Sequence, residues 1–307
     1  MEVLMRWFQI LTVPVVVLAL AGCGGSDNSF PFRSLAAEPS GEAVKIRYDM
    51  EPGEAVRLTM HGTGRIEATG PVTVDAPVTQ DLEMVMRCTQ RLPDGGLELE
   101  YEIASFSMSM PGVPGGDAAQ ASLDGIVGTK LKLQLAPNGQ IKDLDLGALA
   151  GPGSQQIKEL FNRPGFQTFV PMPEGGMRVG EAIDIATIMP AESLEQLMEK
   201  SVPGGGIKPK LEGEMVLKAV REVDGEQAAE FAVNVVMNLK GSFSKGSEDA
   251  DMDMGMRVTG TSLTSLRTGM PIGSGSSRME LRMDMEAGDV EMSMRMNMDM
   301  QITAKRE

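Results

Sequence analysis

The sequence has few of the residues on which most catalytic and metal sites depend. Its 307 residues include two cysteines and one histidine, His61. A single histidine excludes a histidine-based metal cluster, and it leaves His61 as the only base for a serine or cysteine nucleophile. His61 precedes Gly62 near the end of a predicted strand, where an exposed or hydrogen-bonded histidine is commoner than a catalytic base. We therefore predict that the protein is not an enzyme and has no catalytic residues, metal site or cofactor.

Aromatic residues and positive charge are also scarce. Aromatic residues make up 4% of the chain, and the single tryptophan, Trp7, lies in an apolar stretch at the start. Stacking platforms for sugars or nucleic acid bases are therefore not expected. The chain has 28 basic and 43 acidic residues, a net charge of -15, and no segment gathers basic residues. Such an acidic surface disfavours nucleic acids and bare anionic membranes, so we expect no nucleic acid partner.

The apolar stretch at the start is typical of a secretory signal. Residues 7–21 follow a single positive charge, Arg6, and are too short and too interrupted for a permanent span of ~20 apolar residues. The stretch ends in Leu20-Ala21-Gly22-Cys23, which resembles the lipobox of bacterial lipoproteins at all four positions. The resemblance implies a signal peptide over residues 1–22, cleavage before Cys23 and lipidation of Cys23. Two or three acyl chains there would anchor a soluble domain in a membrane almost permanently.

The residues around Cys23 give further expectations. Gly24 follows it. Resemblance to enterobacterial lipoproteins would link an aspartate at this position to retention in the inner membrane, so its absence implies an outer-membrane address facing the periplasm. An ordinary signal peptide that ends in a cysteine by chance is the alternative. With Cys23 lipidated, Cys88 has no disulfide partner, and we expect a buried, inert thiol. Residues 23–42 are polar and lack apolar periodicity, which predicts a flexible tether, with Phe30 and Phe32 able to dock on the folded part.

Alternation of apolar and polar residues is the strongest pattern in the chain. It is clearest over residues 292–303, and residues 279–285 show it as well, with a turn at 286–289 between the two runs. On a helix the apolar residues would scatter around every side, whereas on a strand they all point one way. The sequence therefore predicts a long antiparallel hairpin. One face of its second strand carries Met292, Met294, Met296, Met298, Met300 and Ile302.

The same test predicts most of the remaining strands. Turn sequences at 93–96, 137–139 and 224–225 separate several of them and contain residues that tolerate a positive φ. Two short helices are predicted at 154–161 and 191–200. We expect a mainly β fold, with long antiparallel strands in one or two curved sheets, as a sandwich or a half-open barrel. The further strands are predicted near residues 44–50, 55–67, 79–92, 97–108, 123–135, 215–223, 229–239 and 252–264.

A weak internal similarity divides the mature chain into two parts. Residues 83–87 align with residues 214–218, and each segment precedes an Asp-Gly turn. Strands of similar composition also align by chance, so a true duplication and a coincidence both stay open. The expected organisation is a first β-rich half at 43–150, a Gly/Pro-rich connector with a short helix at 151–177, and a second β-rich half at 178–307.

The order of motifs resembles one family. After the lipobox come Tyr48-Asp49-Met50-Glu51-Pro52-Gly53-Glu54 and the methionine-rich strands, then Phe169-Val170-Pro171-Met172-Pro173 and Val179-Gly180-Glu181. This order resembles the bacterial lipoproteins grouped as the DUF6263 family, over most of the mature chain. The resemblance implies an envelope lipoprotein, and it implies no particular activity.

The 26 methionines give the predicted hairpin a face with its own chemistry. Thioethers are soft ligands for copper(I), but copper sites usually add histidine or cysteine, and neither lies near the hairpin. Methionine also fills apolar cores as a flexible side chain, and it can line a pliable cavity for apolar ligands. We take Met292, Met294, Met296, Met298 and Met300 as a candidate face for an apolar ligand, with ordinary core packing as the alternative.

These observations give two competing functional predictions. The first is an envelope lipoprotein, anchored to the membrane through Cys23, that binds a lipid or another apolar ligand on its methionine-rich sheet face. The second is a structural or protein-interaction module of the cell envelope with a closed core and an acidic surface. An enzyme would have to work with carboxylates alone, and it is the least favoured class.

Overall fold

The computed structural model describes most of the chain after the lipobox. The described residues are 28–71, 73–113, 127–145, 172–187, 206, 208–245, 248–288 and 290–307. Within them the structure is mainly β, which confirms the predicted fold class. No helix among these residues is long and apolar enough to cross a membrane. The helices predicted at 154–161 and 191–200 lie outside the described residues.

Eleven antiparallel strands form one large sheet, and two further strands form a small one. The alternating runs of the sequence become long strands of the large sheet, as predicted. Its strands are β2 (Ala55–Thr69), β3 (Val74–Arg91), β4 (Leu97–Ser109), β5 (Lys130–Leu135), β6 (Ile141–Asp145), β8 (Ala182–Asp184), β9 (Lys208–Val223), β10 (Glu226–Lys245), β11 (Glu248–Ser265), β12 (Gly273–Ala287) and β13 (Val290–Arg306). The small sheet pairs β1 (Ser40–Val44) with β7 (Met177–Val179), and a 3₁₀ turn, η2, covers Ile185–Thr187.

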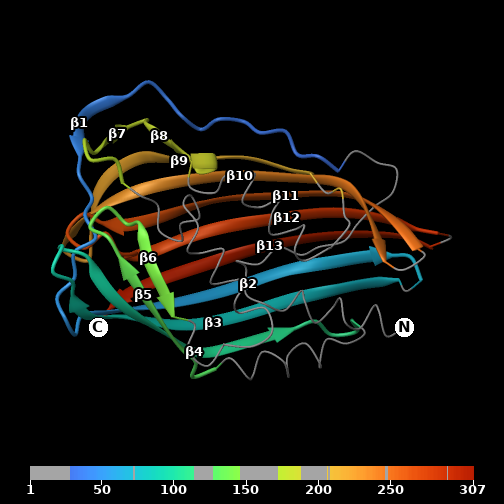
Figure 1. Cartoon of the computed structure of the whole chain (residues 1–307), viewed down its shortest axis with the longest axis horizontal. Helices are drawn as coiled ribbons and strands as arrows, with labels where there is room; N and C mark the ends of the chain where they lie inside the picture. The colour runs from blue at the N-terminus through green and yellow to red at the C-terminus, as the bar shows by residue number, and fades with distance from the viewer. Residues whose placement is uncertain are drawn as a thin grey trace.

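The large sheet is a meander whose first and last long strands meet in its middle. The strand order is β6-β5-β4-β3-β2-β13-β12-β11-β10-β9-β8, with β2 paired to β13 (Figure 1). The predicted halves, 43–150 and 178–307, thus supply neighbouring parts of one sheet, β2–β6 and β8–β13. Among the described residues, β6 and β8 are its edges and do not pair with each other, so this part of the chain forms an open sheet.

The sheet curls strongly. Laid flat, eleven strands would be about 48 Å wide. Nevertheless, Leu133 of β5 and Leu144 of β6 share one core with Ile183 of β8 and Leu217 of β9. Side chains from both edges can share a core only if their face of the sheet is the inside of the curl. We call this side the inner face and the opposite side the outer face.

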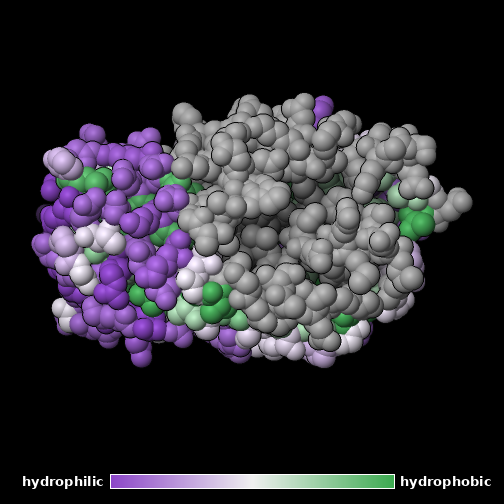
Figure 2. Space-filling view, turned by 60° about the horizontal axis from the view of Figure 1, so that its bottom comes forward, coloured by the Kyte–Doolittle hydropathy of each residue, from purple (hydrophilic) through white to green (hydrophobic). Residues whose placement is uncertain are grey.

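The inner face carries two cores, one toward each end of the strands. The first core lies where β2 begins and β13 ends, and it contains Phe231 and several leucines. On the outside, this end of the molecule shows mostly hydrophilic residues (Figure 2). The second core lies toward the other end and is rich in methionine, which fills irregular space as a flexible side chain. Its buried members include Met237, Leu239, Met252, Met254, Leu281, Met283, Met294, Met298 and Met300.

The strand predicted over residues 44–50 is wrong. Strand β1 ends at Val44, and residues 45–50 belong to no strand. Their alternation instead places Ile46, Tyr48 and Met50 in the first core, while the residues between them are exposed. In the described part of the chain, residues 45–50 pair with no strand. Buried and exposed side chains therefore alternate in this segment although it belongs to no sheet. Burial also raises the pKa of Tyr48 above its ordinary value.

The predicted turns are confirmed. Asp224 and Gly225 have φ values of 52° and 81° and join β9 to β10. Gly139, between β5 and β6, has a φ of 91°, and a side chain there would meet the ring of Tyr48, with Cε2 only 2.3 Å from the added Cβ. A larger residue at Gly139 would therefore strain the backbone and displace Tyr48 from the first core.

An ion-pair network joins four segments at the end of the sheet that holds the first core. Glu226 of β10 accepts a hydrogen bond from the Ser265 hydroxyl at 2.6 Å and pairs with Arg306 at 2.9 Å. Arg267 lies 3.6 Å from the same Glu226 oxygen. Glu54, just before β2, pairs with Arg306 and lies 3.5 Å from Arg267. Two carboxylates and two guanidiniums thus fasten the start of β2 to the start of β10 and to the ends of β11 and β13.

The network lowers the pKa of both carboxyls. The hydrogen bond from Ser265 has the largest effect on the pKa of Glu226 and lowers it. Partial burial raises this pKa, but Arg267 and Arg306 lower it further. Burial alone would raise the pKa of Glu54, but the backbone hydrogen bond at Glu51 and the two guanidiniums bring it below its ordinary value. A carboxylate with a lowered pKa stabilises the folded state above the unfolded pKa of about 4.3. Its contribution is lost as the pH falls through the folded pKa.

We therefore expect the free energy of unfolding to fall as the pH drops below about 4.3. Glu226→Gln should lower the stability at neutral pH by about 1.5–3 kcal/mol, because a charge-assisted hydrogen bond is lost. The variant should also lose less stability on acidification than the parent. Denaturant titrations at a series of pH values measure both effects. Glu222→Gln, at an exposed position of β9, is the control, and an equally steep acid dependence in Glu226→Gln would contradict the assignment.

Candidate functional site

The five methionines of the predicted ligand face lie together on the inner face of β13. Met294, Met298 and Met300 are 3–5% exposed, and Met292 and Met296 are partly buried. On β12 the cross-strand neighbours of Met294 and Met298 are Met283 and Met279. The period-two pattern therefore placed this face correctly. The structure adds that the face continues over β12, β11 and β10 as part of the second core.

Two glycines of β2 allow the methionines to lie close to the sheet. Gly64 is the cross-strand partner of Met298, and Gly62 is that of Met300. A Cβ on Gly62 would lie 3.2 Å from the sulfur of Met298, and one on Gly64 would lie 2.1 Å from the carbonyl oxygen of Asn297. A larger residue at Gly64 would require the backbone of β13 to move, whereas one at Gly62 would require a small shift of the Met298 side chain. The flat backbone of β2 and the mobile thioethers together make a smooth, deformable apolar surface.

The other residues singled out in the sequence lie elsewhere. As predicted, Cys88 is buried, in the first core, with its sulfur 3.7 Å from the carbonyl oxygen of Met50, and burial raises the pKa of its thiol. His61 lies on the outer face and forms a cross-strand pair with Asp81, at 2.7 Å between Nδ1 and Oδ1, and both side chains are more than half exposed. Among the described residues, no three His, Cys, Asp or Glu side chains are grouped closely enough to hold a metal ion. Cys23 lies outside the described residues.

Part of the expected tether is bound to the sheet. Residues 28–38, which we call the strap, cross the outer face from β12 to β9 and continue to Gly180, between β7 and β8 (Figure 1, blue). Two asparagines of β10 hold its backbone. Asn238 accepts a hydrogen bond from the Phe30 N–H at 2.9 Å and donates one to the Phe30 carbonyl at 3.2 Å. Asn234, four residues earlier on the same face, donates to the carbonyl of Arg33 at 2.6 Å.

Both ends of the strap have polar contacts as well. The side chain of Asn28 donates to the carbonyl of Asp253 at 3.2 Å and to the carboxylate of Asp284 at 3.0 Å. Toward the other end, Glu214 of β9 accepts a hydrogen bond from the Ser34 hydroxyl at 2.8 Å and another from a backbone N–H of the strap. Glu214 is buried beneath these contacts. Residues 28–38 are therefore packed on the sheet as part of the fold. They do not form the flexible tether that was predicted over residues 23–42.

Phe30 anchors the strap. The residue is 3% exposed, and the guanidiniums of Arg257 and Arg282 lie over its ring, at 4.9 and 4.3 Å from the ring centre. Gly255 of β11 lies beneath it. A Cβ on Gly255 would come within 2.1 Å of the Asn28 carbonyl oxygen and 3.0 Å of the Phe30 ring. A glycine in the middle of a long strand is thus explained by the close approach of the strap.

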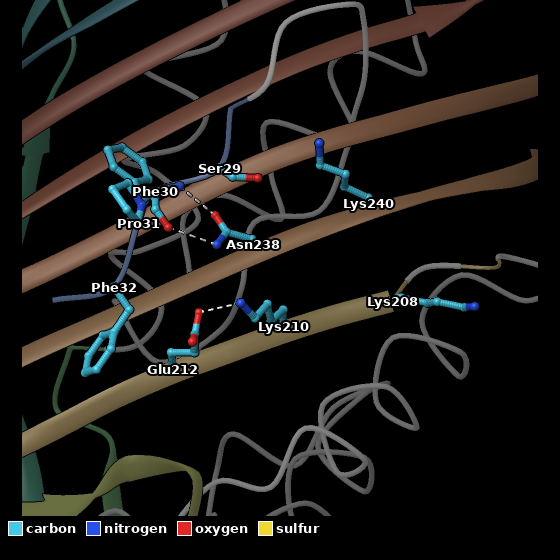
Figure 3. A pocket seen from close by; sticks show the side chains of 9 residues that line it. All are labelled: Ser29, Phe30, Pro31, Phe32, Lys208, Lys210, Glu212, Asn238 and Lys240. Carbon is cyan, nitrogen blue, oxygen red and sulfur yellow. Dashed lines mark hydrogen bonds and ion pairs between the residues drawn. The ribbon is translucent and has the colours of Figure 1, made fainter. Parts of the chain in front are cut away.

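A pocket of ≈620 Å³ lies beside the strap on the outer face. Residues 29–32 line it on one side, and Lys208, Lys210 and Lys240 of β9 and β10 lie across from them (Figure 3). Glu212 and Asn238 complete the lining. We call this the lysine pocket. It was missed in the sequence because Lys240 is 32 positions from Lys208 in the chain, whereas the register pairs these two residues directly.

Comparisons with known proteins add little. No protein-family model and no curated protein sequence matches the chain. Among solved structures, it is similar to DynF from the dynemicin biosynthesis pathway of Micromonospora chersina, with 10% sequence identity and a TM-score of 0.18. That alignment covers 89% of this chain and 95% of DynF. A likeness at this level carries no argument about fold, activity or ligand.

Proposed function

We propose that this protein is an envelope lipoprotein, anchored to the outer membrane through lipid on Cys23, that binds a lipid or another apolar ligand on its methionine-rich inner face. The observation that carries the proposal is the continuous apolar inner face of a curled but open sheet. Membership in the DUF6263 lipoproteins belongs to the same proposal.

The character of the inner face supports an apolar ligand of variable shape. Met292 and Met296 are partly buried beside fully buried methionines, so their side chains have room to change rotamer. The edges β6 and β8 are not hydrogen-bonded to each other, so the curl can widen without breaking a ladder. Pockets for small apolar ligands are mostly lined by such side chains.

The position of the strap supports an anchor that leaves the inner face accessible. The first described residue, Asn28, lies on the outer face, five positions after Cys23 in the chain. Five extended residues reach about 17 Å at most. Acyl chains on Cys23 would therefore leave the protein from the outer side, and the inner face would remain available for another ligand.

A closed-core structural or interaction module is the second candidate. The low exposure of Met294, Met298 and Met300, at 3–5%, favours it, because these side chains already have packing partners in the second core. In this case the acidic outer surface, and not the inner face, would carry the function.

Native mass spectrometry with lipid extraction separates the two candidates. We expect the chain from Gly24 onward, purified without detergent from a bacterial envelope, to carry one apolar ligand. Met292→Gln and Met296→Gln together should abolish that ligand, because polar amides would replace the two thioethers with room to move. Asn297→Gln with Asp299→Asn, on the outer face of the same strand, should not. A bare protein mass in the parent would overturn the ligand proposal and leave the closed-core module.

A further inference from the structure

The lysine pocket has the opposite charge from the protein around it. The chain carries a net charge of -15, yet three lysines and one carboxylate, Glu212, line this pocket. Glu212 pairs with Lys210 at 2.8 Å, and Asp253 pairs with Lys240 at 2.9 Å. Lys208 forms no ion pair with any described residue. The side chains of Lys210 and Lys240 remain 69% and 54% exposed, so their ammonium groups can still meet an anion from solution.

The pocket lies beside the point from which the lipid anchor would leave. Its lining begins at Ser29, next to Asn28, and the strap fixes both residues on the outer face. Since Cys23 is at most about 17 Å from Asn28, acyl chains on Cys23 would hold the membrane surface close to the pocket. Phe32, which is partly buried, adds apolar surface to the wall that the strap forms.

We propose that the lysine pocket binds the phosphate of an anionic phospholipid headgroup in the membrane that holds the anchor. The proposal rests on the lipoprotein function, and it adds a second, electrostatic contact that fixes the outer face against the bilayer. Lysine ammonium groups bind phosphate as compact point charges, and basic residues near an anionic membrane attract it within a Debye length. Because the acyl chains already supply firm attachment, the basic pocket would act mainly on the orientation of the protein at the membrane.

The test measures how fast each lysine is acetylated when the full chain, with whatever anchor it carries, is placed on vesicles. One vesicle set is phosphatidylcholine, and the other is an equal mixture of phosphatidylcholine and phosphatidylglycerol. We expect several-fold slower labelling of Lys208, Lys210 and Lys240 on the anionic vesicles only, with the protection lost at high salt. Lys130, Lys142 and Lys305, on other strands, are internal controls and should label equally on both. Lys208→Gln and Lys240→Gln should each lower the affinity for anionic vesicles about fivefold.

Separate readouts distinguish the failure of each proposal. Equal labelling on both vesicle sets would overturn the headgroup proposal. Protection by inorganic phosphate alone, without any dependence on phosphatidylglycerol, would overturn it in favour of a free anion. The intact mass of the same sample reports acylation of Cys23. An unmodified cysteine would contradict the anchor, while labelling with excess anionic vesicles would still test the pocket by itself.

Discussion

Replacing Met298 with alanine is expected to lower the free energy of unfolding by about 2–5 kcal/mol. Met298 is 4% exposed in the second core, and its side chain lies over Gly62, where no Cβ can move in to fill the space. The neighbouring strands β2 and β12 are held in register along their length, so the cavity cannot close by a shift of one strand. The loss should therefore include both the transfer of the side chain and the cavity that remains.

The same measurement distinguishes the two candidate functions. A closed core predicts the full loss in ligand-free protein, measured by denaturant titration. Met298→Leu, which keeps the volume, should then cost less than about 1.5 kcal/mol. A ligand-lined face predicts a small loss in ligand-free protein and a larger one with ligand present, because a ligand that binds only the folded state stabilises it more strongly the tighter it binds. Unchanged stability in ligand-free Met298→Ala would exclude the closed core.

Long strands were predictable because their pattern is local. In β13 each apolar residue is two positions from the next, and the same spacing continues on β12, so the sequence fixes both strands and the inner face. The turn at Asp224 and Gly225 was equally local, since a tight hairpin needs a positive φ at these residues. The five candidate methionines came from this reasoning, and the structure places them together.

Short and irregular segments were not predictable in the same way. Strand β6 has five residues and β8 has three, too few to show alternation. Residues 45–50 alternate because they cover the end of a core, and nothing in the sequence says that no strand pairs with them. Whether two segments pair depends on residues far away in the chain, and a local pattern contains no such information.

The outer-face features depend on register, which the sequence does not show. Lys208 and Lys240 are 32 positions apart, and they become neighbours because β9 pairs with β10 at those residues. The prediction that no basic patch exists considered only the order of residues along the chain. Gly255, in a strand otherwise rich in methionine, was the one local sign that another backbone approaches closely. That sign pointed to β11 but not to the strap that crosses it.

Phe30→Ala is expected to release the strap, with a loss of about 3–5 kcal/mol from the contacts that hold it. The ring is 3% exposed, and two guanidiniums stack on it. Hydrogen exchange should become fast over residues 28–38 and should increase at the outer-face positions of β10 and β11. Phe32→Ala, at a partly buried position of the same segment, is the control and should have a smaller effect. Slow exchange of the strap in Phe30→Ala would show that the asparagine and Glu214 contacts are sufficient without the ring.

Gly255→Val should also release the strap, because the valine side chain on β11 would occupy the space of the Asn28 carbonyl. The two changes should not add in a double variant, since either one alone already removes the shared contact. A released strap also changes the reach of the anchor. The distance from Cys23 to the first fixed residue would grow from about 17 Å at Asn28 to about 58 Å at Ser40. If the strap orients the protein on the membrane, Phe30→Ala must therefore remove the protection of Lys208 and Lys240 by anionic vesicles while leaving acylation of Cys23 unchanged.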